Sequence, residues 1–132
     1  MRSFQNDDDY VPSAHNTPYN SCKSYVVVDS HHAKVLQSKN KDEIREMASL
    51  TKMMTAICTL ELAFEMKLDI RSTYFKVSNK ASGTVGTTAF LLDGQVLSIW
   101  DLLHGLMLPS GNDSAMVLAE NFSVRLLGRA NR

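Results

Sequence analysis

Residues 47–63, MASLTKMMTAICTLELA, are the stretch that decides the fold of this 132-residue chain. The apolar residues that recur at helical spacing along it and just beyond it are Met53, Ile57, Leu60 and Phe64. This spacing places them on one face of an α-helix, which we interpret as core, and no proline or glycine interrupts residues 42–67. Ser49 is a residue type that commonly caps the start of a helix. The sequence therefore predicts a helix within residues 42–67, with Ser49 near its beginning.

Two short apolar runs precede this helix and predict a β-hairpin. The runs are Ser24–Asp29, SYVVVD, and Val35–Ser38, VLQS, and a short polar connection separates them. The first run is apolar at consecutive positions, a pattern typical of a strand that is covered on both faces. We therefore expect the strand at Tyr25–Asp29 to be buried on both sides.

The chain after residue 67 predicts short extended pieces and two further helices. The expected elements are an extended piece at Tyr74–Ser78, a Gly/Ser/Thr-rich loop at Asn79–Thr88, a turn at Asp93-Gly94, a helix from Ser98 through Leu108 and a helix that runs to about Leu127. In a capping box, a serine and the acidic residue three positions later each bond the other's backbone N–H. This pattern is present at Ser98 with Asp101 and again at Ser110 with Asp113, so two capping boxes are predicted.

Composition and charge argue against several classes of protein. The chain has 14 Lys and Arg residues against 14 Asp and Glu residues, so its net charge near neutral pH is zero. This balance is not that of a nucleic-acid or anionic-membrane surface, and we expect no nucleic-acid partner. A hydrophobic share of 44% and a length of 132 residues predict one small globular domain. Its two cysteines, Cys22 and Cys58, lack metal-site spacing and are interpreted as reduced thiols or at most one bridge.

The first 23 residues differ in character from those that follow. They are polar, contain Pro12 and Pro18 and show no periodicity, so we predict a loosely ordered extension at 1–23 and a domain at 24–132. The extension has no apolar region typical of a secretory signal, and no run in the chain approaches the ~18 apolar residues that span a bilayer. We therefore expect no signal peptide and no membrane span, and the sequence assigns no compartment.

Ser49 and Lys52 form the first candidate for catalysis. At positions i and i+3 of a helix, a hydroxyl and an amine lie on one face, one turn apart. An uncharged amine at that reach can take the proton of the hydroxyl as it attacks a carbonyl, which is the Ser-Lys variant of nucleophilic catalysis. Because free lysine has a pKa of about 10.4, this role requires dry surroundings. Leu50, Met53 and Met54 flank the pair and are expected to provide them.

The spacing alone leaves a structural alternative open. Ser38 and Lys41 satisfy the same S-x-x-K pattern at a polar end of the hairpin, where nothing would desolvate them. In the alternative interpretation Ser49 is a helix cap and Lys52 is a solvated surface residue.

Ser110 and Asn112 form the second candidate. They lie at the break between two predicted helices, from which a hydroxyl and a carboxamide can project into a cleft. The hydroxyl could relay a proton to a leaving amine, and the amide could bond a peptide group of a substrate. The alternative is a helix cap that Asp113 completes, which accounts for the same residues without any catalytic role.

These segments, in this order, resemble one family of enzymes. Residues 47–63 are similar to the active-site helix of the serine-type D-alanyl-D-alanine carboxypeptidases, the low-molecular-weight penicillin-binding proteins. Residues 25–52 are similar to the family's opening hairpin and lead-in, and residues 76–120 to its helical region through the S-x-N motif, here S-G-N. The resemblance implies an α+β fold, in which an N-terminal β-hairpin and a helical lobe form part of a penicillin-binding-protein transpeptidase-like (β-lactamase-like) domain without its C-terminal strands.

The resemblance also implies a chemistry. Ser49 would be the nucleophile that becomes acylated, Lys52 the base that activates it, and Ser110 the group that passes a proton to the leaving D-alanine. Asn112 would hold the substrate backbone, and the backbone N–H of Ser49 would supply half of the oxyanion hole. The implied ligand is a D-alanyl peptide or a β-lactam, and neither a metal nor a cofactor is implied.

The chain departs from the family at the third motif, K-T-G. None of its six glycines follows Lys-Thr, Lys-Ser or His-Thr, and the resemblance implies that this motif carries the second oxyanion donor and the anchor for the substrate carboxylate. The leading interpretation is a serine-type D-Ala-D-Ala carboxypeptidase, acting through an acyl-serine, that lacks the K-T-G half. The alternative is a non-catalytic binding or structural subunit of a larger assembly. In either case we expect a protein partner that pairs with the strand at 25–29, because a two-stranded hairpin is marginal on its own.

Overall fold

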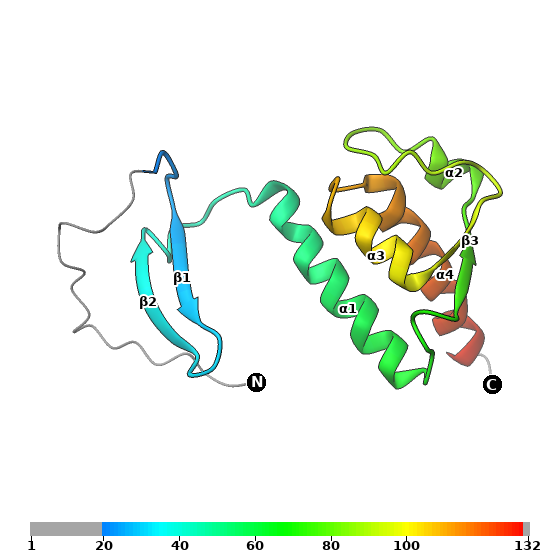
Figure 1. Ribbon diagram of the computed structural model, residues 1–132, viewed down its shortest axis with the longest axis horizontal. Helices are drawn as coiled ribbons and strands as arrows, with labels where there is room; N and C mark the ends of the chain where they lie inside the picture. Colours follow the sequence, from blue (N-terminus) through cyan, green and yellow to red (C-terminus); the bar gives the residue numbers. More distant parts are fainter. Residues whose placement is uncertain (1–19, 131–132) are drawn as a thin grey trace. The chain divides into compact units, whose positions relative to one another are not determined.

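The computed structural model describes residues 20–130 of the chain (Figure 1). The chain divides into two compact units between Glu46 and Met47. The first unit contains a β-hairpin, and the second contains the helices and a second, smaller sheet. Apart from residues 20–23, the predicted N-terminal extension lies outside the described residues.

The hairpin of the first unit agrees with its prediction. Strand β1, Tyr25–Asp29, pairs antiparallel with strand β2, Lys34–Lys39 (Figure 1). The second strand extends one residue further at each end than Val35–Ser38. The register shifts between Val27 and Val28, so Leu36 is the extra residue of a β-bulge that the sequence did not indicate.

Strand β1 is more exposed than its apolar sequence predicts. Val26, Val27 and Val28 keep between 36% and 52% of their surface exposed. The expectation that this strand is buried on both sides is wrong for residues 20–130, because β2 is the one strand that pairs with β1 there. A run of consecutive valines needs a cover on each face to be buried.

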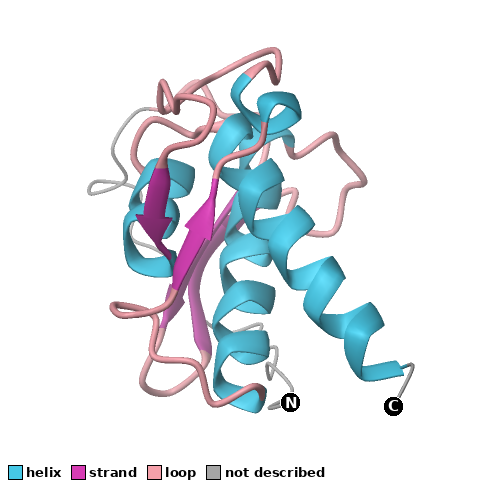
Figure 2. Cartoon of the chain, turned by 90° about the vertical axis from the view of Figure 1, so that its right-hand side faces the viewer, coloured by secondary structure: helices cyan, strands magenta, loops and turns pink. Residues whose placement is uncertain are grey.

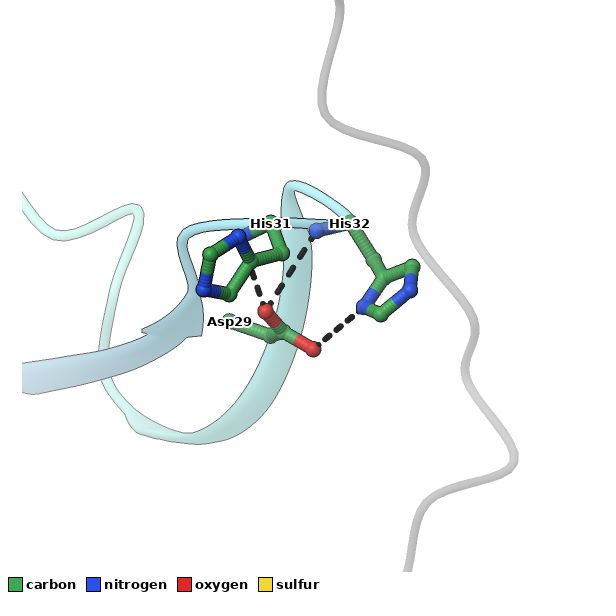
Figure 3. A network of polar contacts seen from close by, with 3 residues as sticks. All are labelled: Asp29, His31 and His32. Carbon is green, nitrogen blue, oxygen red and sulfur yellow. Dashed lines mark hydrogen bonds and ion pairs between the residues drawn. The ribbon is translucent and has the colours of Figure 1, made fainter.

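One aspartate closes the turn between the two strands (Figure 3). The Asp29 carboxylate accepts hydrogen bonds from the backbone N–H of His31 at 2.8 Å and of His32 at 3.3 Å, and it lies 2.7 Å from Nδ1 of His32. The bond with the His32 ring, followed by the bond with the His31 N–H, lowers the pKa of Asp29. Both histidines are exposed and their rings point in different directions, so the turn faces solvent.

The second unit is mainly helical. Its elements are a 3₁₀ turn at Ala48–Leu50, helix α1 at Thr51–Glu65, strand β3 at Tyr74–Lys76, helix α2 at Asn79–Ser82, strand β4 at Val96–Ser98, helix α3 at Ile99–Met107 and helix α4 at Asn112–Ala130. Strands β3 and β4 pair antiparallel. Figure 2 colours the elements by type, and α4 is the helix that leads to the C-terminus. Every helix within residues 20–130 is too short or too polar to span a lipid bilayer.

Helix α3 begins at the first predicted capping box. The Ser98 hydroxyl accepts the backbone N–H of Asp101 at 3.0 Å, and the Asp101 carboxylate accepts the backbone N–H of Ser98 at 3.3 Å. The reciprocal bonds satisfy two N–H groups that the helix itself leaves without partners. This prediction is confirmed.

The region between β3 and β4 is partly helical. The extended piece predicted at Tyr74–Ser78 corresponds to β3, but the loop predicted at Asn79–Thr88 is wrong in its first part. Ser78 accepts the backbone N–H of Ala81 at 3.0 Å and so caps the short helix α2.

The core of the second unit lies between α3, α4, β3 and one side of α1. Its largest fully buried apolar side chains are Phe75, Ile99, Leu102, Leu106, Leu118, Val77 and Val117. Phe75 of β3 and Phe122 of α4 meet edge to face, with ring centres 5.3 Å apart. Burying one such side chain contributes about 1.5–3 kcal/mol, so this core fixes α3 and α4 and the connection between them.

Helix α1 turns a different face to this core from the one that its periodicity predicts. Its buried residues are Thr59 and Ala63. The exposed fractions along the predicted stripe of Met53, Ile57, Leu60 and Phe64 range from 46% to 86%. The interpretation of this stripe as core is therefore wrong within the unit. Because α1 carries apolar residues around most of its circumference, its periodicity does not decide which side packs on α3 and α4.

Candidate active site

Ser49 and Lys52 lie together at the start of α1. Ser49 belongs to the 3₁₀ turn that leads into the helix, and Lys52 lies in the first helical turn. The distance from Lys52 Nζ to Ser49 Oγ is 3.4 Å, at the long end of hydrogen-bond distances. The i, i+3 spacing therefore brings the predicted nucleophile and the predicted base within reach of each other.

Ser49 does not cap the helix. Leu50 occupies the cap position of α1, and no side chain bonds the N–H groups there. The interpretation of Ser49 as a cap is wrong because the 3₁₀ turn runs directly into α1 after Ala48, whose φ is +47°. A left-handed alanine costs about 1–2 kcal/mol, and such backbone strain is concentrated at functional sites.

The surroundings of this pair are open. Ser49 is exposed, and Leu50, Met53 and Met54 each keep more than half of their surface in solvent. The expectation that these three side chains desolvate Lys52 is therefore wrong for the described residues. A side chain that is itself mostly in water does not exclude water from its neighbour.

Ser110 lies on the connection between α3 and α4. Its backbone is left-handed, with φ of +59°, and its hydroxyl is buried with no hydrogen-bond partner among the residues that the structure describes. The capping box predicted for Ser110 and Asp113 is wrong, because a cap residue needs an extended backbone to direct its hydroxyl at the N–H groups of the helix. Buried polar groups without a partner are rare, which makes this hydroxyl a candidate for contact with a ligand.

Asn112 is the first residue of α4 and is held by the segment before β4. Its Nδ2 donates to the carbonyl of Val85 at 2.9 Å, and its backbone N–H donates to the carbonyl of Thr87 at 2.7 Å. Gly86, with φ of +111°, leaves the room for this contact, since a Cβ there would lie 2.4 Å from Nδ2. With the amide nitrogen bonded inside the chain, the amide oxygen is the group that can accept an N–H of a substrate.

The fold brings the four predicted residues to one end of the second unit. Figure 1 shows the start of α1 and the α3–α4 connection at the same, upper end of this unit, and α1 contacts both α3 and α4. Ser49 and Lys52 form one pair there, and Ser110 and Asn112 lie on the other segment. Among the described residues, no hydrogen bond joins one pair to the other.

Asp113 is a residue of this region whose partners the sequence did not reveal. Its side chain is fully buried, and its carboxylate accepts the backbone N–H groups of Ala89 at 3.0 Å and Leu91 at 3.1 Å, and the hydroxyl of Thr88 at 2.7 Å. Burial raises the pKa of Asp113, but these hydrogen bonds outweigh burial and lower it overall. No local pattern could have indicated partners that lie 22 to 25 residues away.

Stability of the second unit should depend on pH through Asp113. Because the folded-state pKa lies below the ordinary value of 3.8, the stabilising contribution is complete above that pH and is lost as the pH falls through the lower folded-state pKa. Asp113→Asn should lower the free energy of unfolding by about 3 kcal/mol near neutral pH, because an amide nitrogen replaces one of the two oxygens that accept buried N–H and O–H groups. The difference should shrink below pH 3.8. Urea unfolding followed by the fluorescence of Trp100, the single tryptophan, measures both quantities, and a difference independent of pH would contradict this assignment.

Comparison with protein families identifies the class. The Peptidase_S11 family, D-alanyl-D-alanine carboxypeptidase, matches residues 12–124. The match includes most of the 132 residues, so the chain belongs to the D-alanyl-D-alanine carboxypeptidase family. The resemblance inferred from the sequence is confirmed.

Individual relatives match over a limited part of their own length. The chain is 33% identical over 101 residues to the D-alanyl-D-alanine carboxypeptidase DacF of Bacillus subtilis, which covers 76% of the chain and 26% of DacF. It is 38% identical over 92 residues to the D-alanyl-D-alanine carboxypeptidase of a Streptomyces species, covering 66% of the chain and 30% of that enzyme. The chain thus spans less than a third of either relative.

Solved structures show the same partial match. The D-alanyl-D-alanine carboxypeptidase DacD from Francisella tularensis superposes with a TM-score of 0.72 at 27% identity, over 89% of this chain and 28% of that one. A mutant DD-transpeptidase of Streptomyces K15 superposes with a TM-score of 0.70 at 28% identity, over 80% of this chain and 40% of that one. The predicted fold class, an α+β part of a transpeptidase-like domain, is confirmed.

Proposed function

We propose that the chain carries the nucleophile half of a serine-type D-Ala-D-Ala carboxypeptidase site. Ser49 is the nucleophile, Lys52 is its base, and the substrate is a D-alanyl peptide or its mimic, a β-lactam. The observation that carries the proposal is the 3.4 Å distance between Lys52 Nζ and Ser49 Oγ at the start of α1, in a chain that belongs to this family.

In the proposed reaction, the Ser49 Oγ attacks the carbonyl carbon of the penultimate D-alanine while its proton passes to the Lys52 amine. Because the pair is exposed in the free chain, this step requires the bound substrate to exclude water from Lys52. The C–N bond to the terminal D-alanine then breaks, and the leaving nitrogen receives, through the Ser110 hydroxyl, the proton that Lys52 took from Ser49. Water hydrolyses the acyl-serine ester and restores Ser49. The buried Ser110 hydroxyl supports its role, because within residues 20–130 it has no hydrogen-bond partner to give up.

Asn112 is proposed to orient the substrate backbone. Its Nδ2 is bonded to the Val85 carbonyl, so its side chain has one fixed orientation in which the oxygen accepts a substrate N–H. A fixed acceptor contributes to the rate by holding the scissile carbonyl at the distance of attack.

A second candidate function is that of a non-catalytic binding or structural subunit. The openness of the Ser49 surroundings favours it, since Leu50, Met53 and Met54 are all exposed.

For both functions we propose a protein partner that pairs with strand β1. Within residues 20–130, β1 has one neighbouring strand, and its three valines are exposed. Neither lysine nor proline is present in Tyr25–Asp29 to discourage pairing at its other edge.

Covalent labelling by a β-lactam tests the catalytic proposal. Incubation of the chain with benzylpenicillin should add one penicilloyl group, because the strained lactam carbonyl acylates a serine and leaves no departing fragment. Ser49→Ala should abolish the adduct. Ser38→Ala is the matched control, since Ser38 and Lys41 share the S-x-x-K spacing, and it should leave labelling unchanged. Intact-mass analysis, followed by mapping of the labelled peptide, measures the result.

Three outcomes are informative. An adduct that persists in Ser49→Ala identifies a different nucleophile. No adduct on the unmodified chain overturns the catalytic proposal and favours the binding subunit. One adduct on the peptide that contains Ser49 supports it.

A further inference from the structure

The carboxylate of Asp113 is buried at the start of α4 and is satisfied by neutral donors. The side chain has no exposed surface, and its oxygens accept the N–H groups of Ala89, Leu91 and Ser114 and the hydroxyl of Thr88. Three of these four donors belong to the segment between α2 and β4. Asp113 therefore holds residues 88–91 against the beginning of α4.

The same segment, a few residues earlier, holds Ser110 and Asn112. The Thr87 carbonyl accepts the backbone N–H of Asn112 at 2.7 Å, and the Thr87 hydroxyl donates to the Ser110 carbonyl. The Val85 carbonyl accepts the Asn112 side-chain amide at 2.9 Å. Segment 85–91 is thus bonded on one side to Asp113 and on the other to both residues of the S-x-N motif.

Packing around Gly111 leaves little space for adjustment. A Cβ at Gly111 would lie 2.6 Å from Oδ1 of Asp113, 2.7 Å from the Gly105 carbonyl oxygen and 3.0 Å from the Ala89 nitrogen. The carboxylate and the backbone of segment 85–91 therefore fill the space beside the motif. Among the described residues the Ser110 hydroxyl has no hydrogen-bond partner, so the hydrogen bond that holds this residue to segment 85–91 is made by its backbone carbonyl.

We propose that Asp113 is a positioning residue of this site: through segment 85–91 it fixes the Ser110 hydroxyl and the Asn112 amide where they serve acylation of Ser49. The inference rests on the proposed function for its effect on acylation. The structural part of the inference, that the positions of Ser110 and Asn112 depend on Asp113, does not depend on the proposed function.

Asp113→Asn tests the proposal, with Asp101→Asn as the matched control. The Asp101 carboxylate likewise accepts a backbone N–H and a hydroxyl, both from Ser98, so its loss destabilises the same unit away from segment 85–91. Two quantities are measured on the 132-residue chain. One is the rate constant of acylation by benzylpenicillin, separated from initial binding by varying its concentration. The other is the hydrogen-exchange rate of the backbone N–H of Asn112, which donates to the Thr87 carbonyl, measured by NMR.

Asp113→Asn should lower the acylation rate constant by about 10²-fold with little change in initial binding, since an error of about 1 Å in placement has that effect. The amides of Asn112 and Ala89 should lose protection together. Asp101→Asn should leave the rate constant and the Asn112 protection of the folded protein unchanged. Equal effects of both variants, or an Asn112 amide still protected in Asp113→Asn, would overturn the proposal.

The two readouts separate this proposal from the proposed function. If the unmodified chain is not acylated, the proposed function fails, and the exchange of the Asn112 amide alone decides whether Asp113 positions the motif. If Asp113→Asn does not fold, Thr87→Val replaces it, because that change keeps Asp113 and removes the hydroxyl that donates to Ser110. Acylation should then slow by about tenfold, as expected for one lost hydrogen bond, with the Asn112 amide still protected. An unchanged rate constant would count against the proposal.

Discussion

The purified 132-residue chain should release D-alanine from a D-Ala-D-Ala peptide at far less than about one turnover per second, the low end of common enzyme rates. None of its six glycines belongs to a K-T-G, His-T-G or K-S-G sequence, so this chain lacks the motif that the resemblance assigns to the second oxyanion donor and the carboxylate anchor. Losing one oxyanion donor typically costs about 10²- to 10³-fold in rate, and a missing anchor adds to that loss. The exposed Ser49 acts in the same direction, because water around a nucleophile weakens every electrostatic interaction there.

A coupled assay that detects D-alanine released from a short D-Ala-D-Ala peptide measures this rate. The Ser49→Ala chain gives the background. The stoichiometry of the penicilloyl adduct gives the fraction of competent molecules, so that a low rate is not mistaken for a misfolded sample. Turnover above about one per second by the 132-residue chain would contradict the expectation.

The chain should also self-associate or aggregate at micromolar concentration unless a partner covers its apolar surfaces. In the first unit, β1 presents exposed valines and one edge without a neighbouring strand among residues 20–130. In the second unit, the α1 stripe of Met53, Ile57, Leu60 and Phe64 is exposed, with Phe64 at 86%. Burying exposed apolar surface contributes about 25 cal/mol per Å², so exposed patches of this kind favour association.

Size-exclusion chromatography with light scattering tests this expectation, and two variants separate the surfaces. Val27→Lys places a charge on β1 and should reduce association if strand pairing drives it. Phe64→Lys places the same charge on α1 and should reduce it if the helical stripe does. A monomer whose backbone amides at Tyr25–Asp29 are strongly protected from hydrogen exchange would contradict the partner proposal, since the strand edge would then already be covered.

Local signals in the sequence predicted the parts of the fold that depend on neighbours in the chain. The capping box of Ser98 and Asp101 formed because all of its bonds lie within four residues. The same pattern at Ser110 and Asp113 did not form, because Ser110 adopts a left-handed backbone and the Asp113 carboxylate bonds a segment more than 20 residues away. Identical spacing therefore had two outcomes, and long-range contacts decided between them.

In the candidate site, too, the sequence predicted what depends on neighbours in the chain and missed what depends on distant contacts. The spacing of Ser49 and Lys52 was sufficient to predict their proximity, because helical geometry sets it. The dryness of their surroundings depends on which face of α1 is covered, and periodicity alone assigned the wrong face to the core of this unit. A helix that is apolar on most sides carries no such information.

The buried charge of Asp113 also has a consequence for how the proposed substrate would bind. The first turn of a helix normally attracts anions, because its free N–H groups and its dipole present positive potential. At α4 this position is already occupied by the chain's own carboxylate, bonded to Ser114 and to segment 85–91. The terminal carboxylate of the proposed D-alanyl peptide therefore gains no attraction from α4. What the α3–α4 connection itself offers to the proposed substrate is uncharged, the Asn112 amide and the Ser110 hydroxyl. Under the proposed function, this connection would therefore contact the peptide bond, and the peptide's carboxylate would need a cation outside it.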